Sequence, residues 1–249
     1  MGAARGRAAA IWYFCTACIC LALVFAAPAA GARSDTLIVA VPGDIVTLDP
    51  ARFTGHALTE IVQRLVYRTL LERDGTALTA GVAVSARARD PLTWEFEIGE
   101  EAAARQGAPL TPEALAQYFN RLASDTGIGG YPAPAKERLA AIERASARER
   151  RLVLHLSEPW PVLPARLAAE PVAALDSRGQ PVATGPFRLE RWDRGNRVIL
   201  VRAGEPPDPD RVVRIQFEVV PSADERLRRV LNGDVHIALD LPPGAFWRL

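Results

Sequence analysis

The chain has 249 residues, which is enough to bury a sizeable hydrophobic core as one large or two small domains. Hydrophobic residues make up 49% of the chain and charged residues 24%, a balance typical of folded proteins and unlike that of disordered ones. The formal net charge is +1, and no basic run is interleaved with aromatic residues. Composition therefore argues against nucleic acid or an acidic membrane as a partner.

Residues 1–32 have the layout of a secretory signal peptide. Two arginines precede an apolar stretch over residues 11–27, and small residues at positions 30–32 offer a cleavage site. Cleavage there removes all three cysteines, so the mature chain needs no disulfide. We predict a signal peptide over residues 1–32, with two alternatives: an uncleaved membrane anchor and a lipoprotein attached at Cys18.

The first predicted elements of the mature chain are a strand and a helix. Residues 36–41 form a continuous apolar run, which predicts a buried strand. A loop through Leu48-Asp49-Pro50 leads to a helix. The residues that recur at helical spacing in it are Leu58, Ile61, Val62, Leu65 and Thr69.

A second strand and a second helix follow. Alternation with polar residues predicts a strand with one buried face, formed by Leu92, Trp94, Phe96 and Ile98. Thr111-Pro112-Glu113 combines a capping residue, a proline at the first helical position and an early acidic residue, so it predicts a helix start. The apolar stripe of this helix is Leu115, Phe119 and Leu122.

The middle of the chain predicts a loop, a helix and a strand. Residues 126–134 are rich in glycine and proline and predict a loop. Residues 135–148 predict a helix with Leu139 and Ile142 facing inward. The alternating leucines at positions 152, 154 and 156 predict a strand.

Residues 181–200, PVATGPFRLERWDRGNRVIL, predict a tight turn followed by a two-stranded unit. Thr184, Gly185 and Pro186 break any preceding helix and force an extended entry into the first strand. Residues 193–196 supply a turn, and the apolar residues 198–200 return as the second strand. We assign Thr184, Gly185 and Pro186 a structural role as the turn.

The last third predicts a strand, a helix and another strand. Val213, Ile215, Phe217 and Val219 share one strand face. Ser222 and Glu225 form a capping box for a helix that Asn232-Gly233 ends, and residues 235–239 form the last strand. Because strands alternate with helices, the fold class is α/β with a mixed sheet.

Several blocks occur in the order found in one known family. They are VAVPGDIVTLDPARFTGHALTEIVQRLVYRTLLERDG, DPLTWEF with PLTPE, TGPF, and ADERLRRVLNGDVHIAL. Together they resemble the extracellular solute-binding proteins of family 5, the oligopeptide-, dipeptide- and nickel-binding components of ABC importers. The resemblance covers residues 36–249. One departure is EEAAARQGA, which replaces the family's basic, His-Asp-Gly segment and puts the local loop structure in doubt.

The resemblance implies a lobe like that of a type II periplasmic binding protein, with a mixed sheet and flanking helices. Residues 33–249 correspond to the first lobe, and the second lobe is expected to be missing, through truncation or because a second polypeptide supplies it. The implied function is the periplasmic, peptide-binding component of an ABC importer, with a permease at the inner membrane as partner. The alternative is a non-binding remnant or interaction module of the same fold.

The resemblance also indicates candidate ligand contacts at Phe53, Thr54 and Gly55, because the corresponding loop of dipeptide-binding relatives touches the ligand. An ordinary strand–helix loop is the alternative. The three histidines lack ligand spacing, so we predict no metal and no cofactor. We also predict no enzyme activity, because the chain has no Gly-x-Ser-x-Gly turn, no HExxH and no glycine-rich phosphate loop.

Overall fold

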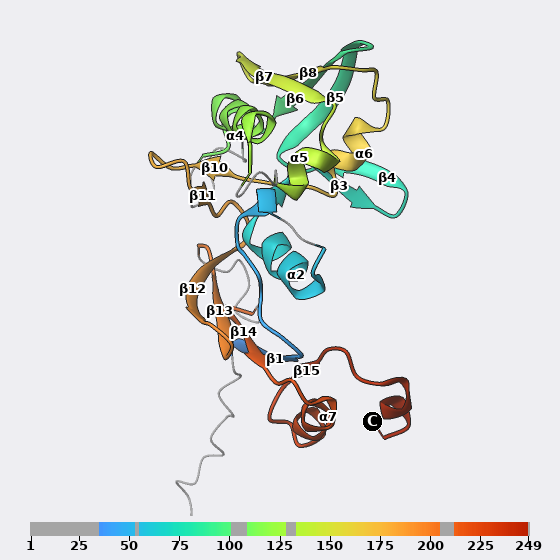
Figure 1. Ribbon diagram of the computed structural model, residues 1–249, viewed down its shortest axis with the longest axis vertical. Helices are drawn as coiled ribbons and strands as arrows, with labels where there is room; N and C mark the ends of the chain where they lie inside the picture. Colours follow the sequence, from blue (N-terminus) through green and yellow to red (C-terminus); the bar gives the residue numbers. More distant parts are fainter. Residues whose placement is uncertain (1–34, 53–54, 101–108, 128–132, 205–211, 249) are drawn as a thin grey trace, which may run out of the picture. The chain divides into compact units, whose positions relative to one another are not determined.

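The computed structural model describes residues 35–52, 55–100, 109–127, 133–204 and 212–248 (Figure 1). Asp35–Leu249 forms one compact unit. The predicted signal peptide over residues 1–32 lies outside the described residues and stays a prediction. Among the described residues, no helix combines the length and the apolar character needed to cross a membrane.

A mixed five-stranded sheet has the order β12-β13-β14-β1-β15. Its strands are β12 (Phe187–Asp193), β13 (Arg197–Arg202), β14 (Arg214–Val219), β1 (Thr36–Val41) and β15 (Ile237–Ala238). β1 runs parallel to both of its neighbours, β14 and β15, whereas β12, β13 and β14 are antiparallel. The predicted strands at residues 36–41, 187–200 and 213–219 and the mixed sheet are confirmed.

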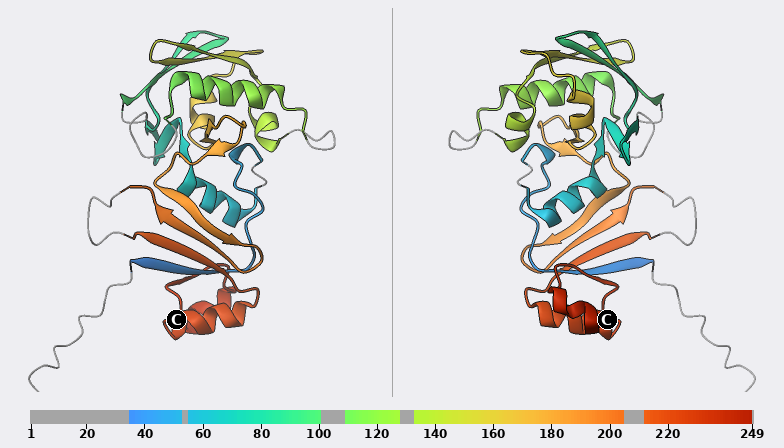
Figure 2. Two further views of the ribbon diagram at one scale, coloured as in Figure 1. Left: turned by 90° about the vertical axis from the view of Figure 1, so that its left-hand side faces the viewer. Right: turned by 90° about the vertical axis from the view of Figure 1, so that its right-hand side faces the viewer.

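A second sheet is antiparallel and four-stranded, with the order β5-β6-β8-β7. Its strands are β5 (Ala83–Asp90), β6 (Thr93–Ile98), β8 (Arg151–Leu156) and β7 (Ile142–Arg148). The helix α4 (Pro112–Ser124) lies across one face of it, as Figure 2 shows. Between the two layers, Phe96, Phe119 and Leu154 are at most 1% exposed.

The predictions for this sheet and helix are confirmed with one exception. Thr111 caps α4, because its Oγ1 accepts a hydrogen bond from the Ala114 N–H at 3.2 Å. Trp94 packs beside Phe96, with ring centroids 6.3 Å apart. Leu92, however, is 42% exposed and precedes β6. Its N–H donates to the Asp90 carboxylate at 2.8 Å, so Leu92 belongs to the turn between β5 and β6.

The predicted helix over residues 135–148 is wrong in its second half. The helix α5 covers Pro134–Arg138 only, and Ile142–Arg148 forms β7. β7 pairs with β8 from Ile142 opposite Leu156 to Arg148 opposite Arg151. Pairing in the sheet overrides the helix propensity of this Ala-, Glu- and Arg-rich sequence, because it buries Ile142 and Ala145.

Two other helices deviate in detail from the predictions. α2 (Ala57–Val66) buries Leu58 and Val62, but Ile61 is 38% exposed, and Thr69 lies beyond the helix in β2. α7 (Ala223–Leu231) is capped by Ser222, whose Oγ accepts from the Glu225 N–H at 3.3 Å. The Glu225 carboxylate pairs with Arg228 instead of reaching back, so half of the predicted capping box forms.

Short elements connect these layers. They are η1 (Pro50–Arg52), β2 (Arg68–Thr69), β3 (Leu71–Asp74), β4 (Ala77–Ala80), α6 (Leu163–Leu167), β9 (Pro171–Val172), β10 (Ala174–Leu175), β11 (Pro181–Val182) and η2 (Pro243–Arg248).

The free edge of β7 is closed by one amide side chain of α4. Asn120 Nδ2 donates to the Ala145 carbonyl and Asn120 Oδ1 accepts from the Ala145 N–H, both at 2.8 Å. These are the hydrogen bonds that a neighbouring strand would make, so the amide blocks further strand pairing at this point.

Replacing Asn120 with alanine is expected to lower the free energy of unfolding by about 1–3 kcal/mol, because both polar groups of Ala145 lose their partner. Urea denaturation measures the loss. Gln117→Ala, at an exposed position of the same helix, is the matched control and should change stability little. Equal losses in the two variants would show that the amide bridge contributes nothing.

Candidate functional site

The candidate site lies at the edge of the mixed sheet where the parallel strands end. β14, β1 and β15 run parallel, so their carboxyl ends emerge at the same edge. In open α/β sheets, ligands bind outside these ends. The chain leaves β1 at this edge through residues 42–56, here called the β1–α2 segment, which contains the predicted contacts Phe53, Thr54 and Gly55.

Only one of the predicted ligand residues can be placed. Phe53 and Thr54 lie outside the described residues. Gly55 is exposed, with a φ of +72°, and no atom lies within 4 Å of where a Cβ would be. The next residue, His56, caps α2, since its Nδ1 accepts from the Thr59 N–H at 3.5 Å. Gly55 therefore stands open to solvent at the entrance to α2.

The start of the β1–α2 segment is fastened to the hairpin of β12 and β13. The Asp44 carboxylate accepts from Trp192 Nε1 at 3.0 Å and from the Gly195 N–H at 2.8 Å. The Val46 N–H donates to Thr59 Oγ1 at 2.9 Å, while the Val46 side chain is 54% exposed. The backbone is thus fixed while an apolar side chain faces outward.

The middle of the segment is held by two side chains that the sequence interpretation missed. Gln63 is fully buried, and its Nε2 donates to the Asp49 carbonyl at 3.0 Å and to the Thr47 carbonyl at 3.3 Å. Arg121 Nη2 lies 2.9 Å from Asp49 Oδ2. The signal that could have revealed Gln63 is its position on the buried face of α2, where an amide needs a partner.

Burial shapes the electrostatics behind the segment. It raises the pKa of Tyr67 and of Tyr118, and the nearby negative charge of Asp49 raises both further. Both phenols therefore stay neutral at physiological pH. Tyr118 donates its hydroxyl to the Pro171 carbonyl at 3.4 Å. The charged groups beside Asp49 are Arg121 and Arg52, whose Nε lies 3.9 Å from Asp49 Oδ2.

The loops after β14 and β15 are held together by one buried arginine. Arg226 is 3% exposed. Its guanidinium donates to the carbonyls of Val220 and Pro221 after β14, at 2.7 and 2.8 Å, and to those of Leu239 and Asp240 after β15, at 2.9 and 2.8 Å. Arg226 therefore ties the loop after β14 to the loop after β15.

The turn at Thr184, Gly185 and Pro186 lies against the end of α2. The N–H groups of Thr184 and Gly185 both donate to the Val66 carbonyl, at 3.0 and 2.7 Å. Thr184 Oγ1 donates to the Val172 carbonyl at 3.2 Å, and the Pro186 carbonyl accepts from the Ala203 N–H at 2.8 Å. These contacts support a role for the turn in positioning α2.

The three histidines lie on separate elements. His56 caps α2, His155 lies in β8, and His236 Nδ1 accepts from the Ile38 N–H at 2.9 Å. Burial, followed by the positive charge of Arg144, lowers the pKa of His155. Within the described part of the chain, no group of three His, Cys, Asp or Glu residues could hold a metal ion.

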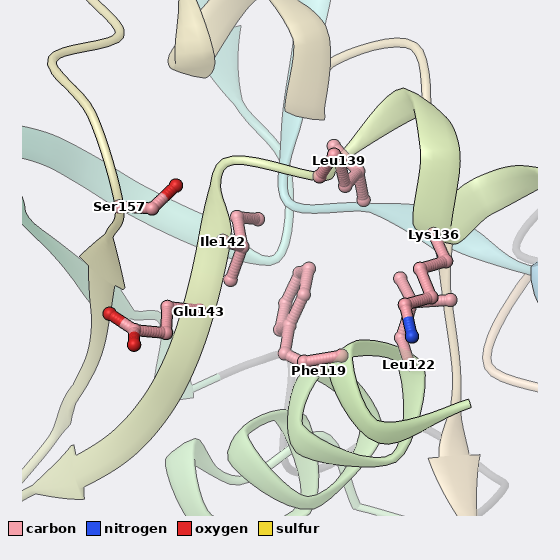
Figure 3. A pocket seen from close by; sticks show the side chains of 9 residues that line it. Phe119, Leu122, Lys136, Leu139, Ile142, Glu143 and Ser157 are labelled. Carbon is pink, nitrogen blue, oxygen red and sulfur yellow. The ribbon is translucent and has the colours of Figure 1, made fainter. Parts of the chain in front are cut away.

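A cavity of about 260 Å³ between α4, α5 and β7 is a weaker candidate (Figure 3). Its wall is mainly apolar and includes Phe119, Leu139 and Ile142. The polar groups do not converge: Lys136 Nζ donates to the Asp125 carbonyl at 2.6 Å, and Phe119 lies between Lys136 and Glu143 in Figure 3.

The fold is that of a lobe of a type II periplasmic binding protein. The Helicobacter pylori DppA structure in complex with the peptide STSA matches with a TM-score of 0.74 at 16% identity, covering 86% of this chain and 48% of that one. The Escherichia coli murein tripeptide binding protein MppA matches with a TM-score of 0.69 at 19% identity, covering 86% and 47%. At these identities, the likeness concerns the fold alone.

The family model of the bacterial extracellular solute-binding proteins, family 5 Middle, matches residues 77–249, and the chain belongs to this family. It is also similar to the probable D,D-dipeptide-binding periplasmic protein DdpA of Escherichia coli (strain K12), at 28% identity over 244 residues. That match covers 89% of this chain and 46% of DdpA, so the chain spans about half the length of this curated relative.

Proposed function

We propose that the chain is the first lobe of the periplasmic peptide-binding component of an ABC importer, working with a permease at the inner membrane. In this proposal, residues 1–32 direct export and residues 33–249 form the lobe. The observation that carries it is the β1–α2 segment at the carboxyl edge of the sheet, which hydrogen bonds from Gln63 and to Asp44 hold in place and which is exposed at Val46 and Gly55, in a chain of this family. The name of DdpA makes short peptides, D,D-dipeptides among them, the first ligands to test.

In this proposal, the β1–α2 segment contacts the peptide through Phe53, Thr54 and Gly55. A glycine at position 55 lets a ligand backbone come close, because no side chain fills the space beside it. The hydrogen bonds of Asp44 and Gln63 keep the segment in place before ligand arrives, which reduces the entropy lost on binding. No covalent step is involved, and the function is reversible capture.

A peptide enclosed between two lobes has both of its ends desolvated and paired, whereas one open face leaves half of these groups in solvent. Loss of one desolvated charge partner costs roughly 2–5 kcal/mol, or about 30-fold to several thousand-fold in affinity. We therefore expect the chain on its own to bind peptides with a dissociation constant of about 1 mM or weaker.

Calorimetry and amide chemical-shift titration with D-Ala-D-Ala, L-Ala-L-Ala and a tripeptide mixture test this expectation. Gly55→Val should abolish the shifts that ligand induces. Gly75→Val is the matched control, since Gly75 has a similar φ of +59° and open space around it but lies in the turn between β3 and β4. Micromolar affinity would refute the one-lobe argument, and no binding at any concentration would favour the remnant or interaction-module alternative.

A further inference from the structure

The face of the four-stranded sheet turned away from α4 carries rows of polar side chains. The strand register sets three rows: Ser85, Glu97, Arg151 and Arg148; Arg87, Glu95, Val153 and Ser146; and Asp90, Thr93, His155 and Arg144. Within the described residues, no helix covers this face (Figure 2). It is therefore an open surface.

The half of this face formed by β5 and β6 carries the carboxylates Asp90, Glu95 and Glu97 beside Arg87 and Arg89. Glu95 is only 4% exposed, and its two carboxylate oxygens accept from Arg87 Nη2 at 2.6 Å and from Arg89 Nη1 at 2.8 Å. Glu97 accepts from Ser85 Oγ at 3.4 Å. These carboxylates have partners on their own half of the sheet.

The half formed by β7 and β8 is not balanced in charge. Arg148 stands directly opposite Arg151, and Arg144 stands directly opposite His155. No ion pair joins Arg144, Arg148 or Arg151 to a carboxylate among the described residues, although Glu97 stands opposite Arg151 in the register. Like charges directly opposite each other destabilise a sheet, so stability does not account for the pair of Arg148 and Arg151.

The surface beside these arginines is hollowed. One open hollow of about 410 Å³ is lined by Arg148 and His155 on β7 and β8 and by Arg89 and Asp90 on β5. Another, of about 540 Å³, is lined by Arg144 and His155 and also by Glu143. The two hollows share Thr93 and His155, so together they reach from the hairpin of β7 and β8 to the turn between β5 and β6.

We propose that Arg144, Arg148 and Arg151, the arginine stripe, bind an extended acidic segment of a partner protein. Arg144 and Arg148 are about 13 Å apart along the strand, and the neighbouring strand lies about 5 Å away. A strip of this length and width can hold one extended chain in which two carboxylates are about four residues apart. The planar guanidinium pairs with a carboxylate through two parallel hydrogen bonds.

The same charge pattern disfavours a lipid surface. A flat anionic membrane would approach the whole face, including Glu95 and Glu97 of β6. An extended segment can run along β7 and β8 and avoid Glu95 and Glu97, and it then meets Glu143 at the end of the stripe beside Arg144. This interaction is independent of any ligand at the β1–α2 segment.

The test is fluorescence anisotropy of the full chain with a labelled octapeptide of alternating glutamate and serine, at low salt. The combined variant Arg144→Gln, Arg148→Gln, Arg151→Gln should bind about tenfold more weakly or worse, as the loss of three exposed ion pairs predicts. The matched control, Arg73→Gln, Arg178→Gln, Arg188→Gln, removes the same charge at exposed positions elsewhere and should bind like the parent chain. The same peptide with glutamine in place of glutamate should not bind.

A thermal melt provides a second readout. Because the stripe variant removes like charges that face each other, its melting temperature should equal or exceed that of the parent chain. Three outcomes would overturn the proposal: equal weakening in the stripe and control variants, binding of the glutamine peptide, or stripe-dependent binding to phosphatidylglycerol vesicles without binding of the acidic peptide. A lower melting temperature of the stripe variant would mean that these arginines are structural and would also overturn it.

Discussion

Replacement of Arg226 with alanine is expected to lower the free energy of unfolding by about 3–5 kcal/mol. The side chain is 3% exposed and is the donor for the carbonyls of Val220, Pro221, Leu239 and Asp240. Without it, these carbonyls lose a charge-assisted hydrogen bond, and the void left by the guanidinium adds a packing loss. The loops after β14 and β15 should separate as a result.

Urea denaturation followed by tryptophan fluorescence measures the effect. Arg228→Ala is the matched control on the same helix, because the Arg228 side chain is 56% exposed and, within the described part of the chain, forms its ion pair with Glu225. This control should lose far less stability. Arg226→Lys should fall in between, since one ammonium keeps the charge but cannot reach carbonyls on two loops. Comparable losses for Arg226→Ala and Arg228→Ala would contradict the role of Arg226 as the link between the loops.

Local sequence patterns predicted correctly those helices and strands whose structure follows from requirements within the segment itself. The alternation around Phe96 and the capping residue Thr111 both predicted their elements, because burial of one face and satisfaction of helix-end N–H groups are local requirements. The helix predicted for residues 142–148 was wrong because these residues form a strand by pairing with β8. The helix propensity of the segment carries no information about that distant partner.

The candidate site was predictable only in part. Family resemblance indicated the loop at Gly55, but the contacts that hold the β1–α2 segment join residues far apart in the chain. Asp44 reaches the Trp192 indole across 148 residues, and Arg226 serves carbonyls on two separate loops. Such long-range hydrogen bonds produce no recognisable pattern of residue spacing in the sequence. A buried amide such as Gln63 is the one local sign that a backbone segment must pass nearby.

Replacement of Gly185 with alanine is expected to lower the free energy of unfolding by about 2–3 kcal/mol. A Cβ at this position would lie 2.7 Å from the Leu65 carbonyl oxygen and 2.7 Å from the Val66 carbonyl carbon. Both are backbone atoms of the last turn of α2, so no side-chain rotation can relieve the overlap. Either α2 or the turn must move, and the 2.7 Å hydrogen bond from Gly185 to Val66 would then lengthen or break.

The matched control is Gly43→Ala, because nothing lies within 4 Å of a Cβ there and its backbone is outside the left-handed region. That variant should stay within about 0.5 kcal/mol of the parent chain. Urea denaturation compares the two, and amide chemical shifts of α2 show whether the helix has moved. Because α2 begins just after Gly55, a displaced helix should also perturb the peptide-induced shifts. A Gly185→Ala variant as stable as Gly43→Ala would show that the turn tolerates a side chain, and the structural role of Thr184, Gly185 and Pro186 would have to be abandoned.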